Sequence, residues 1–128
     1  MEGAEPGHSI VVCAHCCGRQ TIEGLPGGRL ISLLHALFDG DLAGEFRFAE
    51  ADCMAGCGRP LAVAFLAPGK VSYLFGDIDP DRDALHLLTF ARLYRSLSDG
   101  WCNEGQRPRE LKGKTLARIP ALCDAGVT

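Results

Sequence analysis

The stretch SIVVC, residues 9–13, decides how the fold begins. It is a short run rich in β-branched residues that leads into a segment of cysteine and glycine, which is typical of a buried strand. Residues 18–28 contain four glycines and a proline and predict a loop. Apolar residues at helical spacing predict a helix over residues 30–38, and Gly40 stands where it would stop. Residues 46–51 predict a second strand, so this part of the chain forms a β-α-β unit.

The next part of the chain predicts a hairpin and a second helix. Residues 61–66 and 71–75 are apolar runs, and the Ala-Pro-Gly-Lys sequence at 67–70 favours a type I or type II turn between them. Asp79 followed by a proline is a good N-cap and first helical residue. An apolar face at helical spacing then continues toward Gly100, where this helix is expected to end.

The predicted order is therefore β-α-β-β-β-α, which is a mixed sheet with helices packed against it. This is the α/β arrangement of a thioredoxin-like domain, and we expect it to occupy residues 1–100. Residues 101–128 lack clear periodicity, and their Arg-Pro and Ile-Pro pairs suggest an extended C-terminal arm packed on the same domain. With 128 residues, the chain is long enough for one ordinary domain with its own core.

The cysteines form the most informative chemical pattern. Cys13, Cys16 and Cys17 follow the first predicted strand, and Cys53 and Cys57 follow the second. Because the two strands should end at the same edge of the sheet, four thiolates are expected to converge there. An all-sulfur site suits an iron–sulfur cluster or zinc far better than calcium or magnesium.

Several alternatives remain open at this site. Cys17 competes with Cys16, because a Cys-x-x-x-Cys spacing from Cys13 would match the second pair. A thiol oxidoreductase dithiol is a further alternative, but such a dithiol usually lies at a helix N-terminus, and here a loop follows the first pair. His15 would fit a Rieske-like centre only with a second histidine. Arg59 would favour reduction of a nearby cluster, or it simply pairs with a neighbouring carboxylate.

The remaining polar and sulfur-containing residues are given structural roles. The aspartates of residues 77–83 are two residues apart, as in a calcium loop, but the glycine and glutamate of that motif are missing, so helix capping is expected. His8, His35 and His86 are expected on the surface or on a helix face. Cys102 and Cys123 are expected to act as small apolar residues.

Charge and hydropathy exclude some classes of function. Residues 1–100 hold 8 Lys or Arg against 13 Asp or Glu, which argues against nucleic acid as a partner, whereas residues 101–120 hold 5 against 2. This basic tail is expected to dock on the acidic body. No apolar run approaches the ~20 residues of a membrane span, and no signal peptide is evident, so the cytoplasm is the expected compartment.

In combination, the motifs resemble a known family. The chain resembles the thioredoxin-like [2Fe–2S] ferredoxins and, more closely, a small bacterial family of unknown function labelled predicted metal-binding. The resemblance covers about residues 9–121 and rests on VCxxC from residue 12, CxxxCxRP from residue 53, GKVxYxFGD from residue 69, RP at residue 107 and ARIP from residue 117. The ferredoxins leave a longer gap within their first cysteine pair.

The resemblance implies a [2Fe–2S] cluster held by Cys13, Cys16, Cys53 and Cys57, with Cys17 as the alternative to Cys16, and it implies a homodimer. We therefore expect a ferredoxin-like carrier of single electrons to or from a redox partner protein, and not an enzyme. No paired carboxylates, Ser-His-Asp set or phosphate-binding loop points to catalysis. The alternative is a structural or metal-delivery protein that holds zinc or cobalt through the same thiolates.

Overall fold

The computed structural model describes residues 7–13, 26–38, 42, 44–51 and 61–121. Its main elements are β1 (His8–Cys13), α1 (Pro26–Leu37), β2 (Phe46–Ala51), β3 (Val63–Leu66), β4 (Ser72–Phe75), α2 (Pro80–Ser96) and β5 (Thr115–Ile119). Two short 3₁₀ helices, η2 (Glu104–Gln106) and η3 (Arg109–Lys114), precede β5. The predicted β-α-β-β-β-α order is confirmed, and one further strand follows it.

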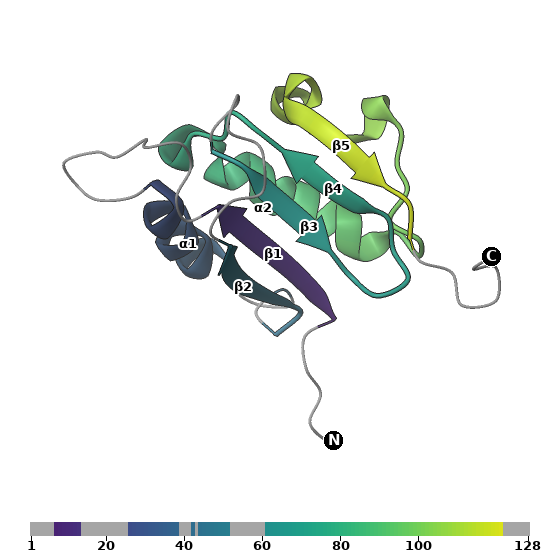
Figure 1. Cartoon of the computed structure of the whole chain (residues 1–128), viewed down its shortest axis with the longest axis horizontal. Helices are drawn as coiled ribbons and strands as arrows, with labels where there is room; N and C mark the ends of the chain where they lie inside the picture. Colours follow the sequence, from purple (N-terminus) through teal and green to yellow (C-terminus); the bar gives the residue numbers. More distant parts are fainter. Residues whose placement is uncertain (1–6, 14–25, 39–41, 43, 52–60, 122–128) are drawn as a thin grey trace.

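The strands form one mixed sheet in the order β2-β1-β3-β4-β5 (Figure 1). β1 and β2 are parallel, as expected for a β-α-β unit, and every other neighbouring pair is antiparallel. The arm after residue 100 was expected to be extended and without regular structure, but its residues 115–119 pair with β4 along the sheet edge. A bulge between Leu74 and Phe75 interrupts this pairing.

Both long helices pack on one face of the sheet. Phe38, which follows α1, makes edge-to-face ring contacts with Phe46 and Phe48 of β2. On α2, Phe90 lies 4.8 Å from the Phe65 ring of β3 and 5.0 Å from the Phe75 ring of β4, measured between centroids. Since Ile10 of β1 pairs with both Phe48 and Phe65, these residues share a face, and the core lies between it and the two helices.

Local chemistry explains the hairpin and the start of α2. Gly69 has φ +73°, and the Lys70 N–H donates to the Ala67 carbonyl at 3.1 Å, which identifies the turn as type II with glycine at its left-handed position. Asp79 is the N-cap of α2, and its carboxylate accepts from the backbone N–H groups of Asp81 and Arg82 at 3.0 Å each.

The helix ends differ from their predicted positions. α1 begins at Pro26 and not after Gly28, because a proline fits the first helical position and glycine is tolerated in a first turn. α2 ends at Ser96 and not at Gly100, since the Leu97 N–H already bonds the Leu93 and Tyr94 carbonyls. Gly100 has φ +77°, and a Cβ there would lie 3.0 Å from the Tyr94 ring, so close packing requires glycine.

Candidate metal centre

The two strands that lead to the cysteine pairs end side by side. Cys13 is the last residue of β1 and pairs in parallel register with Ala51, the last residue of β2. The Cys13 N–H donates to the Ala62 carbonyl at 3.0 Å, so the residues directly before β3 also lie beside Cys13. β1 and β2 therefore end at neighbouring positions at the same end of the sheet, and Figure 1 shows the two strands side by side.

Of the predicted ligands, the structure describes Cys13. The other candidates, Cys16, Cys17, Cys53 and Cys57, lie outside the described residues, and so do His15, Arg59 and Cys123. The convergence of four thiolates thus stays a prediction. Within the part of the chain that the structure describes, no three His, Cys, Asp or Glu side chains gather closely enough to hold a metal ion.

Strand alternation places Cys13 on the face of the sheet that the helices do not cover. Ile10 and Val12 are fully buried in the core beneath α1 and α2, and Cys13 alternates with them, as Val11 does. Val11 is partly exposed, whereas Cys13 is fully buried. A metal bound by the Cys13 thiolate would therefore lie on the helix-free side of the sheet, and this ligand would be shielded from bulk water.

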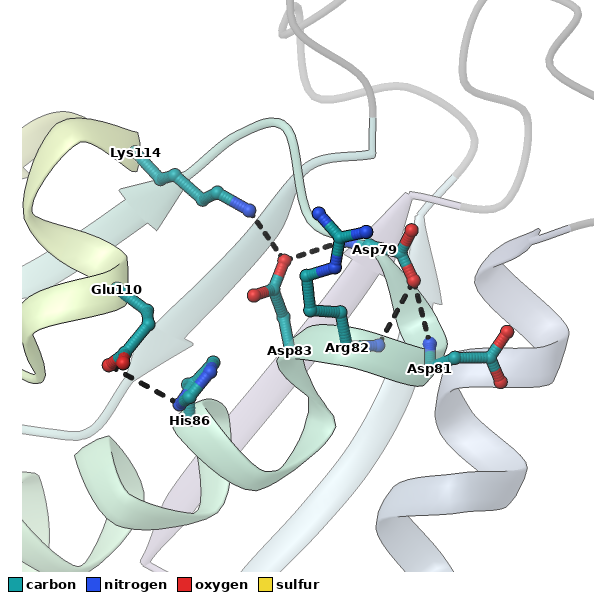
Figure 2. Close-up of polar contacts among 7 residues, drawn as sticks. All are labelled: Asp79, Asp81, Arg82, Asp83, His86, Glu110 and Lys114. Atoms are coloured by element: carbon teal, nitrogen blue, oxygen red, sulfur yellow. Dashed lines mark hydrogen bonds and ion pairs between the residues drawn. The ribbon is translucent and has the colours of Figure 1, made fainter.

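The N-terminus of α2 lies at the same end of the sheet as Cys13. β4 ends at Phe75 opposite Val63 of β3, and the Ile78 N–H then donates to the Leu61 carbonyl at 3.1 Å. The aspartates here were expected to cap this helix, and Asp79 does so (Figure 2). Asp81 instead pairs with Arg29 of α1, which ties together the first turns of the two helices.

Asp83 is the one buried charged or polar residue among those described, and one oxygen of its carboxylate, Oδ2, accepts two hydrogen bonds. It accepts from the Asp79 backbone N–H at 2.8 Å and from the Lys114 ammonium at 2.6 Å (Figure 2). The Asp83 side chain is 2% exposed and that of Lys114 is 24% exposed. Because a buried carboxylate needs both a cation and hydrogen-bond donors, this pair fixes the residues before β5 against the start of α2.

The tail also contacts the body through Cys102, and Arg118 packs against this first part of the tail itself. The Arg118 guanidinium lies 4.5 Å from the Trp101 ring centroid and donates to the Cys102 carbonyl at 3.1 Å. Cys102 itself is buried, and its sulfur lies 3.4 Å from the Tyr73 hydroxyl. This matches its expected role as a small buried residue.

His8 lies in strand β1 and is partly buried, whereas the sequence predicted a surface or helix-face position; His86 lies on α2, as predicted. The His8 ring stacks on Phe46 and lies 2.9 Å from the Lys70 ammonium, which also donates to the Tyr94 carbonyl at the end of α2. Burial and the Lys70 charge lower the pKa of His8, so the neutral ring accepts from Lys70. His86 on α2 lies 3.5 Å from Glu110 of η3 (Figure 2). The hydrophobic periodicity of the sequence does not indicate that His8 contacts Lys70 or that His86 contacts Glu110.

No helix in the described ranges is long and apolar enough to cross a membrane. Among solved structures, a thioredoxin-like [2Fe–2S] ferredoxin from Aquifex aeolicus is similar with a TM-score of 0.56 and 16% sequence identity, covering 94% of this chain and 100% of that one. This likeness confirms the thioredoxin-like fold. No curated protein matches the chain. The family model described as "Protein of unknown function (DUF1636)" matches residues 10–121, so the chain belongs to this family, whose function is unknown.

Proposed function

We propose that this protein binds a [2Fe–2S] cluster and carries single electrons to or from a partner enzyme, without catalysing a reaction of its own. The ligands would be the thiolates of Cys13, Cys16, Cys53 and Cys57. The observation that carries the proposal is the parallel pairing of Cys13 with Ala51, because it starts both cysteine segments from adjacent points of one sheet edge.

Chain length supports this ligand set. Neighbouring strands lie ~4.8 Å apart, and two residues of chain span at most ~7 Å. Cys53 follows Ala51 by two residues, so the Cα atoms of Cys13 and Cys53 are within ~12 Å of each other. Cys16 is three residues from Cys13, which limits that separation to ~11 Å. These limits permit thiolates from both pairs to reach one centre.

The donor chemistry fits the group as well. Four cysteine thiolates are the usual ligands of a [2Fe–2S] cluster, and Cys13 offers a thiol that is shielded from water at the end of a rigid strand. When bound, the cluster would accept one electron from a reductase and release it to an acceptor, its formal charge changing from about −2 to about −3. The solved structure with the similar fold is itself a [2Fe–2S] ferredoxin, which supports the same cofactor here.

Metal and sulfide analysis of freshly purified protein tests the proposal. Two irons and two acid-labile sulfides per chain, a red-brown colour, and uptake of one electron per cluster on titration with dithionite are expected. Protein purified with stoichiometric zinc, without sulfide and without colour, would instead establish the zinc-binding alternative, which the same four thiolates also allow. Metal-free protein that reduces disulfides would contradict both.

Serine substitutions identify the ligands. Cys13→Ser, Cys53→Ser and Cys57→Ser are each expected to abolish the visible absorption, whereas Cys102→Ser is the matched control, because Cys102 contacts Tyr73 and not the sheet edge. Cys16→Ser and Cys17→Ser are compared directly. Loss of the cluster in Cys17→Ser but not in Cys16→Ser would show that the first pair is Cys13 and Cys17.

A further inference from the structure

Two arginines of the C-terminal arm converge on one backbone oxygen. Arg118 lies on β5, an outer strand of the sheet (Figure 1), and its Nη1 donates to the Cys102 carbonyl at 3.1 Å. Nη1 of Arg107, which lies between η2 and η3, is 3.5 Å from the same oxygen. The two Nη1 atoms are therefore within ~7 Å of each other, a separation at which like charges repel. These arginines belong to the RP and ARIP motifs of the sequence, which the proposed cluster does not use.

Positive charge and hydrogen-bond donors are in excess around these two side chains. Within the part of the chain that the structure describes, neither arginine forms an ion pair with a carboxylate. A guanidinium has five N–H donors, and one nitrogen of each arginine has an acceptor among these residues. Nε of Arg107 is buried and makes no hydrogen bond with them. Because a buried donor without an acceptor is costly, this arrangement favours a bound group that brings acceptors and negative charge.

The surrounding residues hold the site in place. Arg118 lies over the Trp101 ring, 4.5 Å from its centroid, which leaves the edges of the planar guanidinium available for hydrogen bonds. The buried Tyr73 hydroxyl donates to the Gly100 carbonyl at 2.8 Å and accepts from the Cys102 N–H at 3.0 Å. Tyr73 thus fixes the backbone on both sides of Trp101 to β4. Because these groups are already positioned, a ligand would bind with a smaller loss of conformational entropy.

We propose that Arg107 and Arg118 form a binding site for a phosphate group, either as the free ion or as a small phosphate monoester. A phosphate monoester carries a charge of about −1.5 to −2 at pH 7, which balances two guanidinium groups, whereas a single carboxylate balances one. Its oxygens accept charge-assisted hydrogen bonds of about 2.7–2.9 Å, so one phosphate can bridge nitrogens that lie ~7 Å apart. Arginine suits this role because its planar fork can donate two parallel hydrogen bonds to a phosphate.

This site is separate from the proposed metal centre. Arg118 pairs with Tyr73 of β4, which pairs with Phe65 of β3. Phe65 in turn pairs with Ile10 of β1, so Arg118 is three strands away from β1. Cys13 is three residues further along β1. With ~4.8 Å between strands and ~3.3 Å per residue, Arg118 and Cys13 are roughly 17 Å apart, so the phosphate site can be tested independently of the cluster.

Isothermal titration calorimetry of the purified full chain at low ionic strength tests the proposal. Saturable binding of inorganic phosphate or of methyl phosphate is expected, with a Kd of about 1 mM or lower. The two ligands are titrated separately, and the tighter one shows whether the site prefers the free ion or a monoester. Trp101 is the one tryptophan of the chain, so its fluorescence is expected to change with the same Kd.

Substitutions of the two arginines locate the binding site. Arg107→Gln and Arg118→Gln are each expected to raise the Kd at least ~10-fold, because each removes charge-assisted hydrogen bonds. Arg118→Lys keeps the charge without the fork and should raise the Kd less, and it serves as the second variant if Arg118→Gln fails to fold by circular dichroism. Arg82→Gln is the matched control: it removes the same charge from the first turn of α2, ~20 Å along that helix from its C-terminal end.

Three results would overturn the proposal. Phosphate and methyl phosphate do not bind at millimolar concentration, folded Arg107→Gln and Arg118→Gln bind them as the original chain does, or Arg82→Gln weakens binding as much as these variants do. A glutamate-rich peptide that binds more tightly than either phosphate, and that loses affinity in Arg118→Gln, would replace the phosphate with an acidic protein partner.

Discussion

Replacing Lys114 with methionine tests whether the Asp83–Lys114 pair holds the end of the chain to α2. Methionine has nearly the length of lysine, so the change removes the ammonium while keeping most of the packing. It leaves the Asp83 carboxylate, whose side chain is 2% exposed, with the Asp79 N–H as the remaining donor of the two described above. An uncompensated buried charge costs about 3–5 kcal/mol. Because the Lys114 side chain is 24% exposed and water can reach its position, we expect a smaller loss than this, about 2–3 kcal/mol.

Urea unfolding followed by circular dichroism measures this loss of unfolding free energy. The control is Arg29→Met, which breaks the Arg29–Asp81 pair; those side chains are 48% and 66% exposed, so its loss should cost less than about 1 kcal/mol. The double variant Asp83→Asn with Lys114→Met removes both charges and should recover part of the stability. If Lys114→Met unfolds at the same urea concentration as Arg29→Met, the buried pair does not stabilise the fold as argued.

Three further predictions concern single sites. The pKa of His8 is lowered in the folded protein, so the contribution of the neutral ring to stability is complete above the unfolded value of 6.5 and is lost as the pH falls through the lower folded value. The urea concentration at the unfolding midpoint should therefore decrease once the pH is below 6.5, and it should decrease less in His8→Gln. Gly100→Ala should lose at least 1–2 kcal/mol in thermal unfolding, and more than Gly69→Ala, because both have positive φ but only Gly100 would clash. Burial raises the pKa of Tyr73 to about 12 and that of Tyr94 still further, so ultraviolet titration should show no phenolate at pH 10 unless the protein unfolds.

Features that depend on neighbouring residues could be predicted from the sequence. The Pro68-Gly69 turn and the Asp79 cap each need only a few adjacent residues, and the structure has both. The start of α1 was placed too late because glycines usually mark loops, whereas a proline before them can begin a helix. Local rules therefore identified most elements and misjudged some of their ends.

Features that depend on distant partners could not be predicted. β5 has no apolar alternation, and it becomes a strand because β4, some forty residues earlier, offers a free edge. Likewise, Asp83 was assigned only a capping role, since nothing local indicates that Lys114, 31 residues away, will supply its cation. The position of Cys13 at a sheet edge could be predicted, because a strand that runs into a cysteine-rich segment is visible in the sequence.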